Sequence, residues 1–135
     1  MKLRRYIYVS KLVANTGDNG LRHIMQRARE NNLKRDLTGA LLFDGESFAQ
    51  LIEGQSDQVL AMISLIRVDS RHEAFTTVCD RMAVDGQRRY STWQNGYVEP
   101  DAFDAFRSKL ALGLDCDPLT ALQEFGHLLA KADVI

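Results

Sequence analysis

The stretch LTGALLFDGESFAQLIEG, residues 37 to 54, contains two strand-like runs separated by a turn signal. Residues 37–43 and 46–53 are rich in apolar side chains, and Asp44-Gly45 stands between them. Aspartate followed by glycine is typical of a type I′ turn, because both central residues of that turn need a positive φ. The stretch therefore predicts a β-hairpin, from which the rest of the fold is built outward.

Gln50 is the unexpected residue of this hairpin. Side chains alternate between the two faces of a strand, which places Phe48, Gln50 and Ile52 together on an apolar face. A buried primary amide carries two donor hydrogens and an acceptor oxygen, and leaving such groups without partners costs about 1–3 kcal/mol each. We therefore expect a polar group to meet Gln50 inside the protein.

The segments on either side of the hairpin alternate between strand and helix patterns. Residues 4–10 are strand-like, and Asp18 or Asn19 is expected to cap a helix that runs to residue 31. After the hairpin, Ser56 or Asp57 is expected to cap a second helix that ends near Asp69. Residues 75–84 and 90–98 read as two further strands. The order βαββαβ plus one strand predicts an α+β sandwich with two helices on one sheet face.

A C-terminal helical extension follows Pro100. Residues 101–113 and 118–131 show helical patterns, with Pro118 at the first position of the second helix. This extension is expected either to cover the free face of the sheet or to form a surface for a partner.

Composition excludes several classes of protein. The chain has 135 residues, 45% of them hydrophobic and 26% charged, with a net charge of −1, so one globular domain is expected and direct binding to nucleic acid or an anionic membrane is not. No apolar run approaches the ~20 residues that span a bilayer, and no signal-peptide core follows the N-terminus, so we expect a cytoplasmic protein. Cys79 and Cys116 show no metal-ligand spacing, and neither do the three histidines, so no metal site is expected.

Several polar residues are expected around the space between the two helices and the sheet. Tyr8 shares a strand face with Tyr6 and Ser10, and Asn31-Asn32 lies at the end of the first helix. Asp69 lies near the C-terminal end of the second helix, where the helix dipole disfavours a negative charge. Individually, an ordinary strand aromatic, a helix cap and an ion pair would explain them. Together with Gln50, they indicate a planar ligand with several carbonyl and N–H groups.

These residues resemble the BLUF domains, which are blue-light sensors using FAD. The resemblance spans residues 3 to 98. It rests on Tyr8 in RRYIYVS, Asn31-Asn32 in ARENN, the stretch LTGALLFDG, Gln50 in FAQLIEG, the segment DSRH from Asp69 to His72, and Trp93 in RRYSTW. It implies a flavin-binding photosensor domain over residues 1–98, with residues 99–135 as a helical cap or interaction extension of the same domain.

The resemblance also implies a fold and a set of cofactor contacts. The fold would be ferredoxin-like, with the isoalloxazine ring of FAD between the two helices, and FMN or riboflavin are alternative cofactors. Gln50 would bridge Tyr8 and the polar edge of the ring, Asn32 would bond its carbonyl and N–H groups, and Ile24 and Ile66 would pack on its faces. The remaining expected contacts are Asn31 and Asp69 as supports and Arg71 and His72 toward the ribityl or phosphate end.

The mechanism that the resemblance implies is signalling rather than turnover, so the protein is not expected to be an enzyme. Excited flavin takes an electron and then a proton from Tyr8, and Gln50 relays the proton and changes its orientation or tautomer. Trp93, expected beside Gln50 on the fifth strand, would transmit the change. We expect the signal to reach a separate effector protein, and the chain to form a homo-oligomer.

The sequence departs from its relatives at three positions. Asn95 stands two residues after Trp93, where many relatives have methionine, and asparagine is a much stronger hydrogen-bonding partner than a thioether. Asp36 stands where glycine is common, and Asp also tolerates positive φ. Leu65 replaces an arginine found in some relatives, which removes one cofactor contact.

Two other readings compete with the sensor. One is a small ferredoxin-like enzyme such as a flavin reductase or hydrolase, although the chain has neither a nucleophile elbow nor a GxGxxG motif. The other is a light-insensitive interaction module with the same fold. Tyr8 and Gln50 argue against the module, because apolar side chains would fill a core at lower cost.

Overall fold

The computed structural model of the chain describes residues 2–83, 86–110 and 117–135. Its helices and strands follow one another in the order β1 (Leu3–Leu12), α1 (Gly17–Lys34), β2 (Thr38–Phe43), β3 (Ser47–Gln55), α2 (Ser56–Arg67), β4 (His72–Met82), β5 (Trp93–Tyr97), α3 (Pro100–Lys109), α4 (Pro118–Ala130) and β6 (Asp133–Val134).

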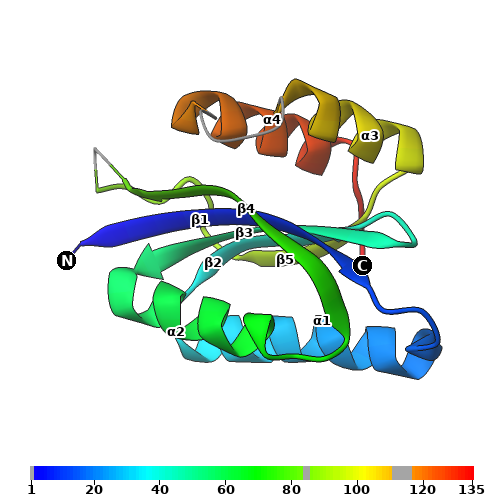
Figure 1. Cartoon of the computed structure of the whole chain (residues 1–135). Coiled ribbons are helices and arrows are strands. Elements are labelled where there is room, and N and C mark those ends of the chain that lie inside the picture. Colours follow the sequence, from blue (N-terminus) through cyan, green and yellow to red (C-terminus); the bar gives the residue numbers. More distant parts are fainter. Residues whose placement is uncertain (1, 84–85, 111–116) are drawn as a thin grey trace.

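The strands form one sheet covered by helices on both faces. Its order is β4-β1-β3-β2-β5-β6, and every neighbouring pair is antiparallel except β2 and β5, which run parallel. Helices α1 and α2 lie on one face, and α3 and α4 lie on the other (Figure 1). The α+β class with a ferredoxin-like arrangement is therefore confirmed, and the C-terminal helices cover the second face.

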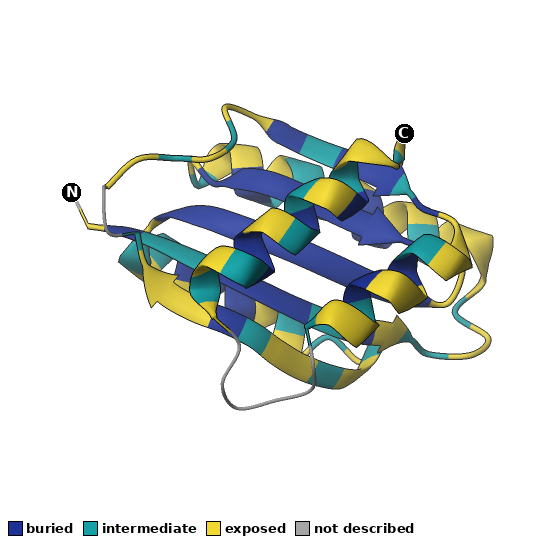
Figure 2. Ribbon diagram, turned by 90° about the horizontal axis from the view of Figure 1, so that it is seen from above, coloured by how far each residue is buried: buried dark blue, intermediate teal, exposed yellow. Residues whose placement is uncertain are grey.

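Each face of the sheet carries its own hydrophobic core. Tyr6, Tyr8, Phe48 and Ile52 belong to the core beneath α1 and α2, whereas Ile7 belongs to the core beneath α3 and α4. The strand alternation inferred from the sequence is thus correct. Figure 2 shows the result, with central strands buried along most of their length and helices exposed on their outer sides.

The hairpin of β2 and β3 is confirmed, but the predicted turn type is wrong. Phe43 pairs with Phe48, and of the two turn residues only Gly45 has a positive φ, of 102°. The Asp44 carboxylate accepts hydrogen bonds from the backbone N–H groups of Glu46 and Ser47, at 2.9 and 2.6 Å. This local side-chain bonding replaces the turn geometry that a positive φ at both positions would give.

Helix α1 extends beyond the predicted end at residue 31, to Lys34. Asp36 adopts φ 55°, its N–H donates to Leu33 O, and Leu37 N donates to Asn32 O at 2.8 Å. These two bonds form a Schellman motif, which satisfies carbonyl groups at the helix end. Asn31 and Asn32 are therefore within the helix rather than at its cap, and Asp36 tolerates positive φ as expected.

The predicted N-caps of the first two helices are wrong. Helix α1 begins two to three residues earlier than expected, after Thr16, whose hydroxyl donates to Val13 O. Helix α2 is preceded by Gln55, because β3 continues to that residue and the Ser56 hydroxyl accepts a hydrogen bond from Arg4 Nε at 2.9 Å. The predicted place of Pro118 at the first position of α4 is right, and the Asp117 carboxylate before it accepts a hydrogen bond from Thr120 N.

Other boundaries differ by a few residues. Helix α2 ends at Arg67, short of Asp69, whose carboxylate bonds Arg71 instead. Strand β4 begins at His72 because it pairs with the end of β1. The short strand β6 was not predicted. The predictions for residues 84 and 111–113 and for Cys116 fall outside the described residues.

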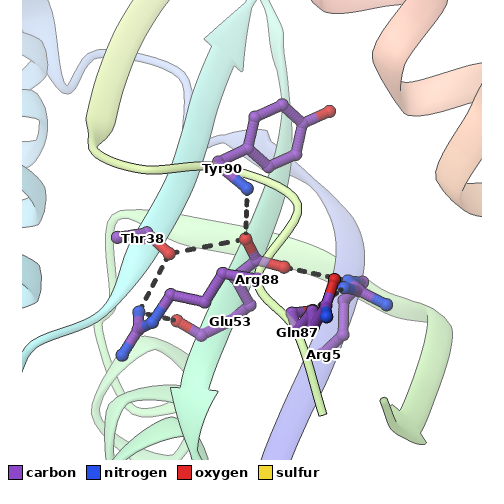
Figure 3. Close-up of polar contacts among 6 residues, drawn as sticks. All are labelled: Arg5, Thr38, Glu53, Gln87, Arg88 and Tyr90. Atoms are coloured by element: carbon purple, nitrogen blue, oxygen red, sulfur yellow. Dashed lines mark hydrogen bonds and ion pairs between the residues drawn. The ribbon is translucent and has the colours of Figure 1, made fainter. Parts of the chain in front are cut away.

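Strand β5 begins at Trp93 rather than at residue 90, because a buried carboxylate holds the preceding loop. Glu53 is fully buried; its side chain accepts from Tyr90 N at 2.6 Å and pairs with Arg5 Nε at 3.0 Å (Figure 3). Arg88 Nη1 donates to Thr38 Oγ1 and Glu53 O at 2.9 and 3.2 Å. We call these residues, Arg5, Thr38, Glu53, Arg88 and Tyr90, the Glu53 network.

Candidate functional site

A cavity of about 200 Å³ lies between α1, α2 and the sheet. Every residue that the sequence predicted to hold a cofactor lines it: Tyr8, Ile24, Asn31, Asn32, Gln50, Ile66, Asp69, Arg71 and His72. The structure thus brings together side chains from two helices and three strands around one space.

Tyr8 and Gln50 form a buried hydrogen bond on the wall of the cavity. The two residues are opposite one another in the β1–β3 register, and the Tyr8 hydroxyl donates to Gln50 Oε1. Burial, with smaller contributions from the charges of Asp69 and Tyr6, raises the pKa of the Tyr8 phenol. Tyr8 therefore keeps its proton at neutral pH, and Gln50 has the polar partner that the sequence required.

Asn32 provides the test of whether a polar ligand fits the cavity. Its side chain is fully buried, and neither its amide oxygen nor its amide nitrogen has a hydrogen-bond partner among the described residues. Buried polar groups are almost always paired, and leaving them unpaired costs about 1–3 kcal/mol each. An amide that lines a cavity fits a ligand with adjacent carbonyl and N–H groups, such as the polar edge of a flavin ring.

Charged residues lie on another part of the cavity wall. Arg71 donates to both carboxylate oxygens of Asp69, at 2.7 and 3.0 Å, and approaches His23 Nδ1 at 2.8 Å. These hydrogen bonds from Arg71 are the main cause that lowers the pKa of the Asp69 carboxyl. Asp69 therefore has a partner, as its place after α2 suggested, and Arg71 is fixed in position.

His72 lies beside this pair at the start of β4. Its Nδ1 is 3.0 Å from Ser10 Oγ, and burial is the main cause that lowers the pKa of its imidazole. The ring is therefore neutral at physiological pH and able to accept or donate a hydrogen bond.

Trp93 is the one proposed photoactive residue that does not line the cavity. It lies on β5, which pairs with β2, so β2 separates it from Gln50 on β3. Its buried indole Nε1 donates to Asn95 Oδ1, and Asn95 Nδ2 donates to Met25 O of α1, both at 3.1 Å. Leu41 of β2 lies in register with both Gln50 and Asn95, and Trp93 belongs to the same core as Tyr8, so the expected position of Trp93 near Gln50 stays a prediction.

Five lining residues were not among the predicted cofactor contacts: Arg27, Ala28, Leu41, Met62 and Leu65. Helical spacing could have found Ala28, because Ile24, Ala28 and Asn31 recur on one face of α1. Leu41 could have been found from the hairpin register, which places it opposite Gln50.

Neither a metal cluster nor a membrane span is present in the parts of the chain that the structure describes. No group of three or more His, Cys, Asp or Glu side chains there could hold a metal ion. None of the helices described is both long and apolar enough to cross a bilayer.

The fold and the cavity define a class of protein, an α+β domain with a cavity between its sheet and two helices that is lined by both polar and apolar side chains. Residues 3–96 match the model of one family in this class, described as BLUF, sensors of blue-light using FAD. This chain belongs to the BLUF family, and FAD is the cofactor of that family.

Individual proteins also resemble this chain in sequence or in structure. The blue light- and temperature-regulated antirepressor BluF of Escherichia coli (strain K12) is 34% identical over 70 residues, which are 52% of this chain and 17% of that protein. Photoactivated adenylate cyclase subunit beta of Euglena gracilis is 36% identical over 87 residues, or 64% of this chain and 10% of that protein. The solved dark-state structure of BlrB, a BLUF protein, has a TM-score of 0.72 with 25% identity, and the match covers 96% of each chain.

The matched part is a small fraction of each curated relative, at 17% and 10% of their lengths. The antirepressor and cyclase activities that their names give are therefore stated of those proteins alone.

Proposed function

We propose that this chain is a blue-light photoreceptor in which Tyr8 and Gln50 convert light into a changed hydrogen-bond network that a separate partner protein reads. The observation that carries the proposal is the buried Tyr8–Gln50 hydrogen bond on the wall of a cavity that also contains the unpaired amide of Asn32. A phenol, a carboxamide and an unsatisfied second amide around one space fit a redox-active ring better than a closed core.

The cavity residues divide into those that hold the cofactor and those that respond to light. Asn32 would bond the polar edge of the ring, supported by Asn31 and Asp69, while Ile24 and Ile66 pack against it from facing helices. Arg71 and His72 would contact the ribityl or phosphate end. When bound, FAD absorbs blue light and in its excited state accepts one electron.

Tyr8 supplies that electron and then its hydroxyl proton. Gln50 Oε1 already accepts the Tyr8 hydrogen bond, so the proton has a direct route along it. Gln50 then changes its orientation or tautomer before the electron and proton return to Tyr8. The lasting product is a different set of hydrogen bonds around Gln50.

Strand β5 carries the signal away from Gln50 in this scheme. Leu41 links the two by register, and Trp93 and Asn95 connect β5 to α1. One hydrogen bond is worth only about 0.5–1.5 kcal/mol net, close to the ~1.4 kcal/mol of a tenfold population change. The output therefore has to bias an element that is already near balance, and we propose that a homo-oligomer or a partner protein reads it.

The central test is the Gln50→Leu variant. It should still retain flavin but lose the reversible red-shift of its absorption under blue light, because no amide remains to rearrange. The exposed Gln26→Leu on α1 is the matched control and should keep a normal photocycle. A normal photocycle in Gln50→Leu would refute the role of Gln50.

Tyr8→Phe tests the electron donor in the same assay. It keeps the ring volume but removes the phenol, so illumination should give no red-shifted state. A colourless purified protein would instead favour the interaction module, and consumption of a nicotinamide cofactor would favour the reductase.

A further inference from the structure

Strand β4 is irregular where it passes Tyr8. It pairs Val9 with Thr76 and Lys11 with Glu73, so Ala74 and Phe75 together oppose the single residue Ser10 of β1. Ala74 has φ 51°, which residues other than glycine seldom adopt. A β-bulge of this kind redirects a side chain, and strained backbone persists where surrounding contacts hold it.

The bulge places Phe75 against the photoactive phenol. The Phe75 and Tyr8 rings stack with centroids 4.5 Å apart and planes inclined by 19°. Phe75 is half-buried and packs on the edge of the core that contains Tyr8. Tyr8 is therefore held by a hydrogen bond at its hydroxyl and by a ring stacked on its face.

Arg67 holds Phe75 in turn. Its guanidinium carbon stands 4.4 Å from the Phe75 ring centroid, and Nη2 donates to Tyr6 Oη at 3.2 Å and to Thr77 Oγ1 at 3.3 Å. Among the residues described, Arg67 forms no ion pair with a carboxylate. Its positive charge is therefore fixed against the ring that stacks on Tyr8, although its exposure lets water screen part of that charge.

We propose that Phe75 and Arg67 are positioning residues for Tyr8: Phe75 fixes the plane of the phenol ring against Gln50, and Arg67 restrains the loss of its electron. The inference rests on the proposed function, in which Tyr8 loses one electron to the excited flavin and passes its hydroxyl proton toward Gln50, both returning on recovery. A nearby cation opposes removal of an electron from the phenol and favours its deprotonated form.

The test compares Phe75→Leu, Arg67→Gln and Arg67→Lys in the full chain. A fluorinated tyrosine at position 8 reports phenol acidity by fluorine NMR titration in the dark, with and without FAD. Arg67→Gln should make the phenol an about threefold weaker acid, because a screened positive charge is lost, and Arg67→Lys should restore it. Phe75→Leu should instead make the Tyr8 phenol a stronger acid, because it uncovers the ring to water.

Light-driven chemistry gives the second readout in the flavin-loaded protein. Transient absorption should show about threefold faster electron donation by Tyr8 in Arg67→Gln. Phe75→Leu should instead lower the yield of the red-shifted state, because the phenol ring is free to leave its productive orientation.

Arg107→Gln is the matched control. Its guanidinium stands 4.5 Å from the Phe103 centroid on the opposite face of the sheet, so its removal should change neither readout. The inference would be overturned if Arg67→Gln kept the phenol acidity and the rate of electron donation of the wild type. It would also be overturned if Arg67→Gln and Phe75→Leu shifted the phenol acidity in the same direction. A full red-shift in Tyr8→Phe would instead overturn the proposed function.

Discussion

At the scale of single residues, Asn32 distinguishes this interior from an ordinary hydrophobic core. Its buried side-chain amide has no partner among the described residues, whereas its backbone carbonyl accepts a hydrogen bond from Leu37 N. A side chain selected only for stability would not remain in that state. We therefore propose that Asn32 lowers the stability of the fold and contributes to cofactor binding.

Asn32→Leu should raise the stability of the fold and lower the affinity for FAD. Without flavin the variant should be more stable than the wild type by about 1–3 kcal/mol, because an apolar side chain of similar size replaces unpaired polar atoms. Its affinity for FAD should fall at least about tenfold, because an aligned hydrogen bond to the ring is worth roughly that factor. Urea unfolding of the flavin-free protein and titration of flavin fluorescence measure the two effects.

Asn19→Leu is the matched control for that prediction, since Asn19 is exposed in the first turn of the same helix. It should leave FAD affinity unchanged. An Asn32→Leu protein that binds FAD as tightly as the wild type would remove Asn32 from the cofactor site.

At the scale of elements, β5 is the strand that we propose carries a change at Gln50 to other parts of the fold. Asn95 accepts from the Trp93 indole, donates to the backbone of α1, and its own carbonyl accepts from Ile135 N at 2.8 Å. A methionine at this position could make only weak contacts of this kind. Asn95 therefore joins β5 to a helix and to the segment after β6.

Asn95→Met should loosen this junction. The buried indole N–H would lose its acceptor, which costs about 1–3 kcal/mol of stability, and the indole should become more accessible. Because Trp93 is the single tryptophan of the chain, its fluorescence reports directly on the site. We expect a red-shifted emission maximum and stronger quenching by acrylamide.

The neighbouring Gln94→Met serves as the comparison, because adjacent residues of a strand face opposite sides of the sheet. It should preserve the emission of Trp93. Unaltered emission and quenching in Asn95→Met would show that Asn95 does not hold the indole.

At the scale of the whole molecule, the Glu53 network connects segments that are far apart in the sequence. It ties β1, β2 and β3 to the loop before β5 (Figure 3). It also approaches α4, because a Cβ at Gly126 would lie 3.7 Å from the Tyr90 hydroxyl. The network thus lies on the sheet face covered by α3 and α4, while Gln50 of the same strand lies on the face covered by α1 and α2.

Glu53→Gln should destabilise the whole fold rather than the flavin site. Removing one charge of a buried pair leaves Arg5 without its partner, which typically costs about 3–5 kcal/mol. Urea unfolding should show a lower midpoint, while FAD binding at temperatures where the protein stays folded should be unchanged.

Asp104→Asn is the control for a surface carboxylate, because its ion pair with Arg107 is exposed. It should shift the unfolding midpoint little. An equally small shift in Glu53→Gln would mean that the buried pair contributes no net stability.

Comparing the expected and observed elements shows which interactions a sequence pattern can report. The faces of β1 and β3 follow from alternation alone, so the placement of Tyr8 and Gln50 in one interior was correct. The predicted helix cap and strand start were wrong where a distant residue formed a hydrogen bond. Arg4 donates to the hydroxyl of Ser56 at the start of α2, and Glu53 accepts from the N–H of Tyr90 before β5. The sequence also does not show that β2 lies between β3, which carries Gln50, and β5, which carries Trp93.

The sequence by itself determined the hairpin, the two faces of the sheet, the family and nine of the residues that line the cavity. Periodicity and local turn chemistry act between near neighbours, so they can be read from a single chain. The tertiary structure alone decided the unpaired state of Asn32, the Asn95 junction, the Glu53 network and the stacking of Phe75 and Arg67 on Tyr8. These depend on contacts between residues that are distant in the chain, whose meeting is fixed by strand order and helix packing.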